Sequence, residues 1–304
     1  MSIHSRSYNK QEDFVPIMRF LAKLFDRTQS YENWFPDRFE NSSDGREDGI
    51  RIWERLNDTI TPHTQEVIAL TTRDSPTDFF LSVDPNYRHV EREMIEWIEE
   101  FRRHSTSGDS KEREVKINIL EGNIEREQLL SQFGYTFKQI YGYYRIRQGN
   151  IPPPEYPCPK EFEIRTLKRS DYDQLALLIR RVFGHGEWFN AEVLEWLSKC
   201  SFYKEDLDLV IMTPENIIAS FCTFRVDPNS CIISLEPMGT NPDYRGLGLG
   251  KAILSEGIKR SLKYDPPFFY IDGAANTPPA NRLYDATGFS EKYAINSWIK
   301  TLDK

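Results

Sequence analysis

In the second half of the chain, short apolar runs alternate with stretches whose apolar residues recur at helical spacing. The runs predict strands and the stretches predict helices. The predicted strands are Phe162–Leu167, Asp208–Met212, Ile217–Val226, Cys231–Gly239, Phe268–Asp272 and Tyr293–Thr301. The predicted helices are Asp171–Phe183, Ala191–Cys200, Lys251–Lys263 and Pro279–Thr287. This order of elements predicts a domain of the α+β (mixed α/β) class.

A proline-rich segment, Gly149–Lys160, divides the pattern into two halves. It has five prolines within the eight positions 152–159, and proline breaks helices and is excluded from central strands. We therefore expect a stiff linker at 149–160 between an N-terminal domain at 1–148 and a C-terminal domain at 161–304. The length of 304 residues is also typical of two domains.

Three short segments recur on both sides of this linker in the same order, which indicates an internal duplication. Residues 84–88 (DPNYR) match residues 241–245 (NPDYR) at an offset of 157. The runs 3–8 and 162–167 match at an offset of 159, and the triplets 133–135 (FGY) and 287–289 (TGF) match at 154. The two halves are therefore expected to share one fold.

Composition and charge mainly exclude function classes. Apolar residues make up 39% of the chain, which is typical of a globular protein. The formal net charge of −8 argues against a nucleic-acid partner and favours cationic substrates such as amines. No apolar run is long enough to span a membrane and no apolar signal segment is seen, so we expect a cytoplasmic protein without a membrane partner.

The four cysteines lack the spacing of metal ligands, so no metal is expected and the thiols should be reduced. The sequence carries no signal for an oligomeric state.

Three glycines follow a predicted strand in the segment 245–251 (RGLGLGK), directly before a predicted helix. Free backbone N–H groups and the helix dipole make such a turn an anion site. A Walker loop would need Ser or Thr where this chain has Ala252, and the dinucleotide fingerprint would need glycine at Lys251. An ordinary strand-to-helix connection needs at most one glycine, so the turn indicates a ligand.

The remaining pattern, Arg-x-x-Gly-x-Gly at Arg245, Gly248 and Gly250, resembles the acetyl-CoA loop of the GCN5-related N-acetyltransferases (GNATs). Residues 276–289 (NTPPANRLYDATGF) resemble the block after that family's fifth strand. The resemblance covers about residues 162–302. With the duplication, it implies two tandem GNAT-like domains, each a twisted, mostly antiparallel sheet flanked by helices. It also implies a splayed pair of parallel strands at the cofactor site.

The resemblance implies acetyl-CoA (CoA) as the cofactor and assigns residues to it. Main-chain groups of Met238, Gly239 and Thr240 would bind the pantetheine arm between the fourth and fifth strands. Asn276 is a further candidate contact, although it lies one residue further from Tyr284 than the family pattern leads us to expect. The residues assigned to the pyrophosphate are Arg245, Gly246, Leu247, Gly248, Leu249, Gly250 and Lys251.

Acetyl transfer to an amine needs a base for the amine proton and an acid for the departing thiolate. Tyr284 lies at the family's tyrosine position and is the candidate acid, because a phenol with a pKa of about 10 is matched to a thiol of about 8.5. The alternative is a core tyrosine packed between helix and sheet. Glu236, in an apolar strand, is the candidate base, directly or through water. Its alternative is a structural carboxylate that caps a neighbouring backbone.

His185 and Glu187, between the first two helices of the second half, are candidate substrate contacts, with a solvated loop as the alternative. No nucleophile motif is present, so direct transfer in a ternary complex is expected. The predicted function is an acetyl-CoA-dependent N-acetyltransferase, an acyltransferase acting through the C-terminal domain on a small-molecule or peptide amine. The alternative is a noncatalytic CoA-binding or regulatory module.

The first half lacks the chemistry-bearing residues at the matching positions. Glu91 and Glu93 correspond to Gly248 and Gly250, and Leu130 corresponds to Tyr284. Two carboxylates in place of glycines predict repulsion of a pyrophosphate and loss of backbone access. The helix Val90–Arg103 is amphipathic and expected to face the core. The first half is therefore predicted to be a degenerate copy that keeps the fold without the cofactor loop.

Overall fold

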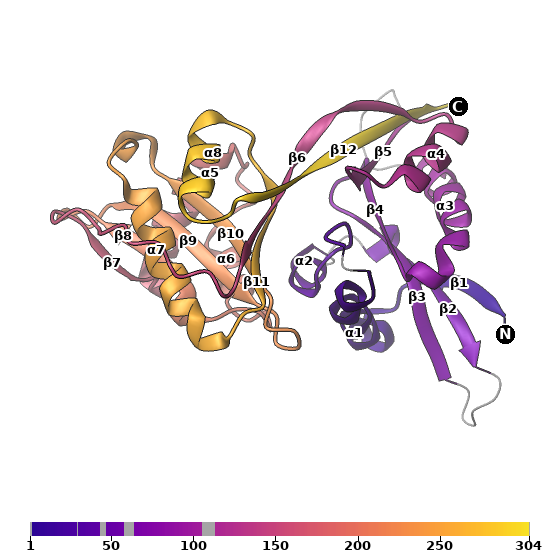
Figure 1. The fold of residues 1–304 in the computed structure, drawn as a ribbon, viewed down its shortest axis with the longest axis horizontal. Helices are drawn as coiled ribbons and strands as arrows, with labels where there is room; N and C mark the ends of the chain where they lie inside the picture. Colours follow the sequence, from indigo (N-terminus) through magenta and orange to yellow (C-terminus); the bar gives the residue numbers. More distant parts are fainter. Residues whose placement is uncertain (1, 29, 43–46, 58–63, 105–112, 304) are drawn as a thin grey trace. The chain divides into compact units, whose positions relative to one another are not determined.

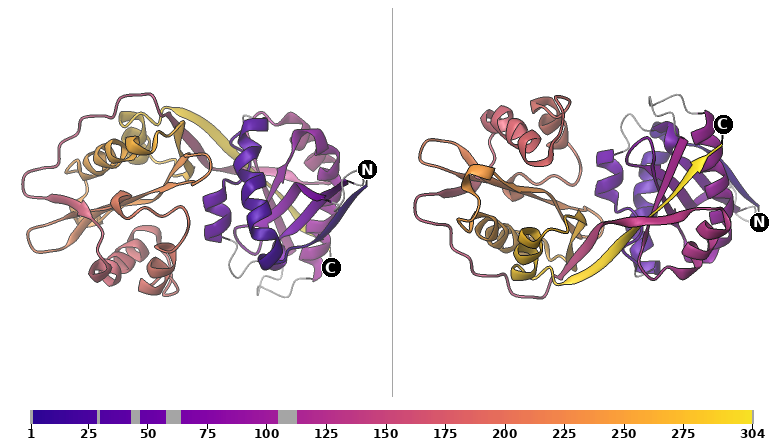
Figure 2. Two further views of the ribbon diagram at one scale, coloured as in Figure 1. Left: turned by 90° about the horizontal axis from the view of Figure 1, so that it is seen from below. Right: turned by 90° about the horizontal axis from the view of Figure 1, so that it is seen from above.

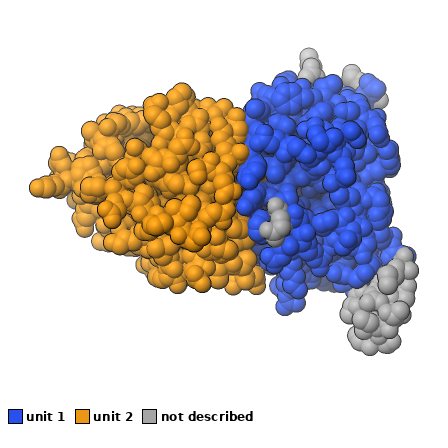
Figure 3. All heavy atoms as spheres, viewed as in Figure 1, with its two compact units in different colours: residues 1–141, 293–304 blue, residues 142–292 orange. Residues whose placement is uncertain are grey.

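The computed structural model describes residues 2–28, 30–42, 47–57, 64–104 and 113–303 (Figure 1). The chain divides into two compact units, coloured separately in Figure 3. Unit 1 comprises Met1–Tyr141 and Tyr293–Lys304, and unit 2 comprises Gly142–Lys292. Each unit has a sheet that is covered by helices on both faces.

Unit 2 is built on a sheet with the strand order β6-β11-β10-β9-β8-β7. Neighbouring strands in it are antiparallel except β10 and β11, which are parallel. Its elements are the second part of β6 (Thr136–Gln148), β7 (Glu163–Thr166), η3 (Arg169–Asp171), α5 (Tyr172–Phe183), α6 (Ala191–Leu197), η4 (Glu205–Leu207), β8 (Asp208–Met212), β9 (Ile218–Val226), β10 (Ile233–Thr240), η5 (Pro242–Tyr244), α7 (Leu249–Ser261), η6 (Leu262–Tyr264), β11 (Phe268–Ala274) and α8 (Pro278–Ala286).

Alternating side chains on the strands of unit 2 build two cores, one on each face of the sheet. On β8, Leu209 and Ile211 pack into the core beneath α7 and α8, whereas Val210 and Met212 pack into the core beneath α5 and α6. Figure 2 shows these two helix pairs on opposite faces of the sheet. The strand period of two therefore decides which helix pair each side chain meets.

Unit 1 has the same architecture, with the strand order β1-β2-β3-β4-β5-β12 and a parallel pair, β4 and β5. One core lies beneath α1 and α2, and the other beneath α3 and α4. Its elements are β1 (Ile3–Ser7), α1 (Lys10–Thr28), α2 (Pro36–Ser42), η1 (Glu47–Gly49), β2 (Arg51–Asn57), β3 (Thr64–Arg73), β4 (Asp78–Val83), η2 (Pro85–Val90), α3 (Glu91–His104), β5 (Arg113–Leu120), α4 (Ile124–Gln132), the first part of β6 and most of β12 (Glu291–Leu302).

Both halves of the sequence run through these elements in the same order, which confirms the repeated fold. The two turns before α3 and α7 share one cap. Asp84 Oδ1 accepts from the backbone N–H of Asn86 at 3.0 Å, and Asn241 Oδ1 accepts from that of Asp243 at 3.2 Å. Likewise Gly134 and Gly288, after α4 and α8, have φ values of +82° and +87°.

The two units do not end where the domains were predicted to end, because each sequence half contributes its last strand to the other unit. From Gly142 on, β6 belongs to unit 2, where it pairs with β11. From Tyr293 on, β12 belongs to unit 1, where it pairs with β5. The compact units therefore differ from the predicted domains 1–148 and 161–304.

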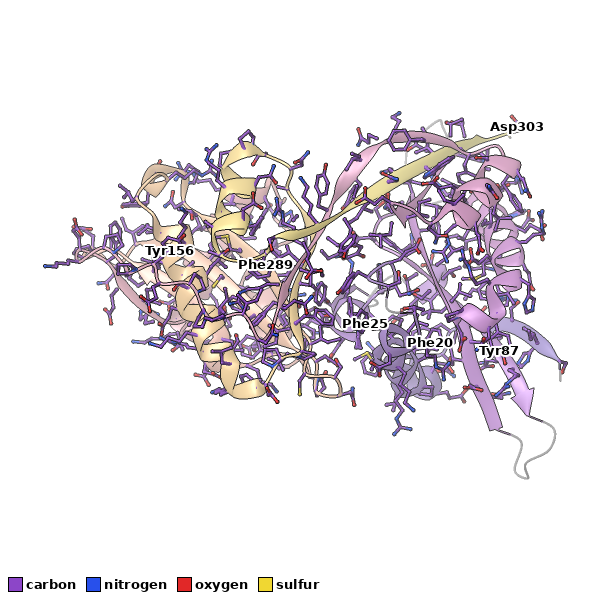
Figure 4. All side chains as sticks on the ribbon, in the orientation of Figure 1. Phe20, Phe25, Tyr87, Tyr156, Phe289 and Asp303 are labelled. Carbon is purple, nitrogen blue, oxygen red and sulfur yellow. The ribbon has the colours of Figure 1, made fainter. Side chains whose placement is uncertain are left out.

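The predicted linker, 149–160, lies within unit 2 and is bound to its helices. The backbone N–H of Tyr156 donates to Ser255 Oγ of α7 at 3.3 Å, and the Tyr156 hydroxyl donates to the Ala286 carbonyl of α8 at 3.2 Å. Figure 4 labels Tyr156 beside α7. The segment is a proline-rich strap on unit 2, and the division between the units falls before it.

Candidate active site

The parallel strands β10 and β11 are paired only where both begin. Ile233 pairs with Phe269 and Ser234 with Tyr270, whereas β10 continues to Thr240 and β11 to Ala274. This divergence confirms the splayed parallel pair expected from the sequence. Backbone groups on an unpaired edge need other hydrogen-bond partners, so the gap is suited to a ligand with amide groups. The segment 238–240 lies on the β10 side of this gap.

A β-bulge lies at the start of the gap. Leu235 pairs with Phe224 and Met238 with Cys222, so β10 has one residue more than β9 over this stretch. Bulges re-aim side chains and are frequent beside active sites. The bulged residues are Glu236 and Pro237, and both line a cavity between the sheet and the α5/α6 pair.

The glycine turn between η5 and α7 has the backbone that only glycine adopts easily. Gly246 and Gly248 have φ values of +83° and +81°, and a Cβ built on either would meet no atom within 4 Å. Gly248 is the N-cap residue directly before α7, a helix of 13 residues. The turn therefore combines backbone N–H groups at a helix N-terminus with open space in front of them.

Two basic side chains flank this turn. Arg245 is exposed, and its Nε donates to the Thr240 carbonyl at 3.3 Å. Within unit 2, whose residues are all described, it has no carboxylate partner. Lys251 Nζ lies 5.0 Å from the ring centroid of Tyr156 in the strap. An anion on the turn would thus find a guanidinium that is not already neutralised.

Tyr284 is held in the core on the α7/α8 face. Its ring is 9% exposed and packs edge-on against Phe289, with 6.2 Å between the ring centroids (Phe289 is labelled in Figure 4). Burial raises the pKa of the Tyr284 phenol above its usual value, and the charge of Arg145 partly opposes this. Within unit 2 the hydroxyl has no hydrogen-bond partner, yet it is not fully enclosed. The phenol is therefore protonated at neutral pH and free to donate.

The family comparison agrees with this geometry. Residues 173–289, from α5 to the residue after the α8 turn, match the family model described as the acetyltransferase (GNAT) family. The matched stretch contains the gap, the bulge, the glycine turn and Tyr284. Residues 173–289 of unit 2 are a GNAT domain.

Solved structures show the same fold over the whole chain. A tandem GNAT protein from the clavulanic acid biosynthesis pathway has a TM-score of 0.71 at 11% identity, covering 100% of this chain and 99% of its own. A GCN5-related N-acetyltransferase from Sphaerobacter thermophilus has 0.68 at 16% identity, covering 98% and 95%. N-myristoyltransferase of Saccharomyces cerevisiae, solved with myristoyl-CoA bound, has 0.59 at 14% identity, covering 98% and 78%.

At these identities the likeness establishes the tandem GNAT fold and not a substrate. No protein of curated function matches the chain.

In the GNAT domain, the candidate base Glu236 lies at the edge of a partly polar cavity. Its side chain is 41% exposed, and its Oε2 lies 3.4 Å from Nη1 of the buried Arg225. Within unit 2 it accepts no hydrogen bond from a backbone N–H. The carboxylate therefore faces water beside a guanidinium and does not cap the backbone.

Asp208 lines the same cavity, and the sequence pattern did not single it out. It is 6% exposed, and its carboxylate accepts from the hydroxyls of Thr223 at 2.8 Å and Tyr203 at 3.0 Å. Burial raises the pKa of Asp208 to about 6. From the sequence, an aspartate at the first residue of an apolar strand is most simply a polar residue at the strand boundary. That Asp208 is buried in a cavity is seen only once α5 and α6 are in place, because residues of both helices line this cavity.

Other predicted site residues lie at the borders of the site. Asn276, in the loop before α8, is exposed and accepts at Oδ1 from Asn281 Nδ2 at 3.0 Å. His185 packs among aromatic rings, with 5.1 Å between its centroid and that of Trp188. The Glu187 carbonyl accepts from Arg180 Nη2 at 2.7 Å, so its loop is tied to α5.

Neither a metal site nor a membrane-spanning helix is found among the described residues. No group of three or more His, Cys, Asp or Glu side chains there could hold a metal ion. Across the described ranges, none of the helices has the length and apolar character that crossing a membrane requires.

Proposed function

We propose that unit 2 is an acetyl-CoA-dependent N-acetyltransferase that transfers an acetyl group directly to an amine in a ternary complex. The observation that carries the proposal is the glycine turn. Its two positive-φ glycines face open space at the start of α7, and the exposed Arg245 beside it has no carboxylate partner in unit 2. A diphosphate fits this combination of N–H groups, space and positive charge.

The residues that hold the cofactor follow from this placement. The pyrophosphate binds at the turn from Arg245 to Lys251, and the pantetheine arm lies along Met238–Thr240 in the gap. Gly250 belongs to the same site because a Cβ there would come within 3.2 Å of Met238 Cε. Asn276 contributes from the loop before α8. When bound, acetyl-CoA supplies the activated acetyl thioester.

Two side chains move the protons. The Glu236 carboxylate, at the bulge, takes a proton from the attacking amine, directly or through water. The Tyr284 Oη donates its proton to the thiolate that leaves. The two groups belong to opposite faces of the sheet, and the splayed strands β10 and β11 open the space between these faces.

The amine acceptor is a small molecule or a peptide. The formal net charge of −8 favours a cationic acceptor, since a field of that sign attracts it. A carboxylate beside a half-open cavity supports the same choice, because Glu236 can hold an ammonium group before it takes the proton.

A noncatalytic CoA-binding module is the second candidate, and the burial of Tyr284 favours it. A tyrosine that is 9% exposed and packed on Phe289 has a structural use without any chemistry. The two functions are separated by measuring CoA release from acetyl-CoA with a panel of primary amines. Release above the rate without protein supports the enzyme. Tight binding of acetyl-CoA with no release on any amine supports the binding module.

A further inference from the structure

The helix that carries Tyr284 is held by a strand from the other half of the sequence. On β6, Arg145 pairs with Ile271 of β11 and Arg147 pairs with Phe269. Residues two apart on a strand share a face, and Ile271 and Phe269 both belong to the core beneath α7 and α8. Two arginines of β6 are therefore directed to the underside of α8.

Arg145 forms hydrogen bonds to residues on both sides of Tyr284 in the sequence. Its Nη2 donates to Asn281 Oδ1 at 2.5 Å, and its Nη1 donates to Asp285 Oδ1 at 2.6 Å and to the Phe289 carbonyl at 2.9 Å. The guanidinium is only 1% exposed. Asn281 and Asp285 flank Tyr284 on α8, so one rigid group fixes the helix on either side of the phenol.

The same guanidinium lies against the phenol ring. The Arg145 Cζ is 5.6 Å from the centroid of the Tyr284 ring. A positive charge at this distance in a buried place favours the phenolate and so opposes the effect of burial on the pKa. The neighbouring charges are Asp285, which Arg145 itself neutralises, and Arg147.

Arg145 also connects α8 to a candidate cofactor contact. Asn281, which accepts from Arg145, donates through Nδ2 to Asn276 Oδ1 at 3.0 Å. Asn276 Nδ2 in turn lies 3.5 Å from the hydroxyl of Tyr143, also on β6. The strand thus orders a hydrogen-bonded row along the loop and helix that border the gap.

We propose that Arg145 is the positioning residue for Tyr284: it fixes the place of the phenol and makes it a stronger acid toward the departing thiolate. The proposal rests on the proposed function for the role of Tyr284. It also gives the first sequence half a part in the reaction of unit 2, because that half contributes β6.

Arg147 provides a matched control on the same strand. It is equally buried, at 1% exposure, and donates to the carbonyls of Thr287 at 3.3 Å and of Ile151 and Pro152 at 2.8 Å. Its Cζ lies 5.3 Å from the ring of Phe269, not of Tyr284. Loss of Arg147 should therefore cost stability without changing the acidity of Tyr284.

The first experiment places 3,5-difluorotyrosine at position 284, whose phenol titrates near neutral pH, and follows its pKa by fluorine NMR. We expect Arg145→Met to raise this pKa by about 1 unit or more and Arg147→Met to leave it unchanged. Equal pKa values in the two variants would overturn the proposal. This readout needs no turnover, so it stays valid if the proposed function fails.

The second experiment separates charge from geometry and serves if Arg145→Met does not fold. Arg145→Lys keeps a charge but cannot reach Asn281, Asp285 and Phe289 together. We expect it to lower kcat about 10-fold or more with the KM for acetyl-CoA nearly unchanged, while Arg147→Lys keeps the kcat of the unsubstituted protein. A normal kcat in Arg145→Lys, or an equal loss in both variants, would contradict a positioning role. If the unsubstituted protein releases no CoA with any amine, the proposed function fails and the fluorine titration alone decides this inference.

Discussion

The two units contain the same turn between their central parallel strand and the following helix, but only one of the two turns is open. In unit 2 the turn ends in Gly248, with open space before it and an exposed Arg245. In unit 1 the matching positions are Glu91 and Arg88, and Tyr87 marks the turn in Figure 4. Glu91 is 2% exposed. We call the turn of unit 2 open, because no side chain stands at Gly248, and the turn of unit 1 closed, because the Glu91 carboxylate stands at the start of α3. A hollow lined by Arg88, Glu91 and Glu125 lies beside the closed turn.

In the closed turn of unit 1, the charge of Glu91 is balanced by two arginine side chains of the same unit. Glu91 accepts from Arg88 Nε and from Arg126 Nε, both at 2.9 Å. These guanidinium groups hold the pKa of Glu91 below its usual value in spite of burial. The sequence led us to expect repulsion of a pyrophosphate by Glu91 and Glu93. In the structure Glu91 neutralises the arginines that would receive the anion, and Glu93 instead accepts from Ser5 at the surface.

The two parallel strands diverge in both units, and in unit 1 an arginine side chain binds beside the divergence. There β4 and β5 are paired only at Asp78 with Lys116 and at Phe79 with Ile117. Arg126 Nη1 donates to the Leu81 carbonyl at 3.3 Å, so it occupies a backbone acceptor of β4 beside the gap. The ladder between β3 and β4 runs without the bulge that β10 has. That unit 1 binds no cofactor remains a prediction, now with a contact that explains it.

The largest expected effect comes from giving unit 2 the residue of unit 1. Gly248→Glu should abolish acetyl-CoA binding, measured by isothermal titration calorimetry, because it places a carboxylate at the proposed pyrophosphate site. Gly248→Ala is the matched control. It carries the cost of a positive φ, about 1–2 kcal/mol, without the charge, and should weaken binding only moderately. Normal affinity in Gly248→Glu would show that the turn is not the pyrophosphate site.

Tyr284 of unit 2 has a hydroxyl, whereas its counterpart in unit 1, Leu130, has none. Tyr284→Phe should lower kcat by about 10²- to 10⁴-fold, the usual loss for a general acid, and leave acetyl-CoA affinity nearly intact. Steady-state kinetics, with chemistry shown to be rate-limiting, measures it. Normal turnover in the folded variant would make the tyrosine a packing residue.

The closed turn of unit 1 should be a structural clamp. Glu91→Gln removes one partner of a buried ion pair and should lower the free energy of unfolding by about 3–5 kcal/mol, measured by urea denaturation. Glu93→Gln, two residues further along α3 and at the surface, should change it by less than about 0.5 kcal/mol. Equal effects of the two substitutions would show that the buried pairing of Glu91 adds no stability beyond that of the surface residue Glu93.

The buried carboxylates of the two units should respond to pH in opposite directions. Glu91 has a lowered pKa, so its contribution to stability is present above the unfolded pKa and lost as the pH falls. Asp208 has a raised pKa of about 6 in the folded protein, so its contribution is present at low pH and lost as the pH rises from about 4 to 6. At about 1.36 kcal/mol per unit, this loss amounts to about 3 kcal/mol.

Asp208→Asn should therefore remove a fall in stability between pH 4 and 6, measured by urea denaturation at each pH. Asp206→Asn serves as the control, because Asp206 pairs with Lys263 near the surface and has a lowered pKa. An unchanged pH profile in Asp208→Asn would show that Asp208 ionises normally.

The smallest expected effect is the stabilisation by acetyl-CoA itself. At a concentration of 100 times Kd it should raise the free energy of unfolding by about 2.7 kcal/mol, with one site per chain. Calorimetric stoichiometry measures the number of sites. Two equivalent sites would show that Glu91 does not keep acetyl-CoA from unit 1.

Local features of the fold could be predicted from the sequence. The predicted strand Phe268–Asp272 is β11 (Phe268–Ala274), and the predicted helix Asp171–Phe183 is α5 (Tyr172–Phe183). The helix predicted to reach Cys200 ends at Leu197, where the chain turns. Apolar spacing and turn residues act over a few neighbours, so these elements are encoded where they form. The glycine turn is local in the same way.

The local sequence of a strand or helix does not determine which other elements it packs against. The alternation 143–148 (YYRIRQ) predicts a half-exposed strand, yet Arg145 and Arg147 are among the largest fully buried side chains, covered by α8. Nothing in the pattern of β6 or β12 says that each joins the other unit. The backbone of one strand edge can pair with that of any other, because backbone hydrogen bonds carry no sequence information. Side-chain packing therefore decides which strands become neighbours.

By itself, therefore, the sequence determined the order of elements, the duplication, the glycine turn and the candidate residues Tyr284 and Glu236. Only the tertiary structure decided the exchange of β6 and β12, the clamp of Arg88 and Arg126 on Glu91, and the place of Arg145 beneath Tyr284. The physical reason is range. Propensity and turn geometry depend on neighbours in sequence, whereas the environment of a buried charge depends on side chains far away in sequence, such as Asp285, which lies 140 positions from Arg145.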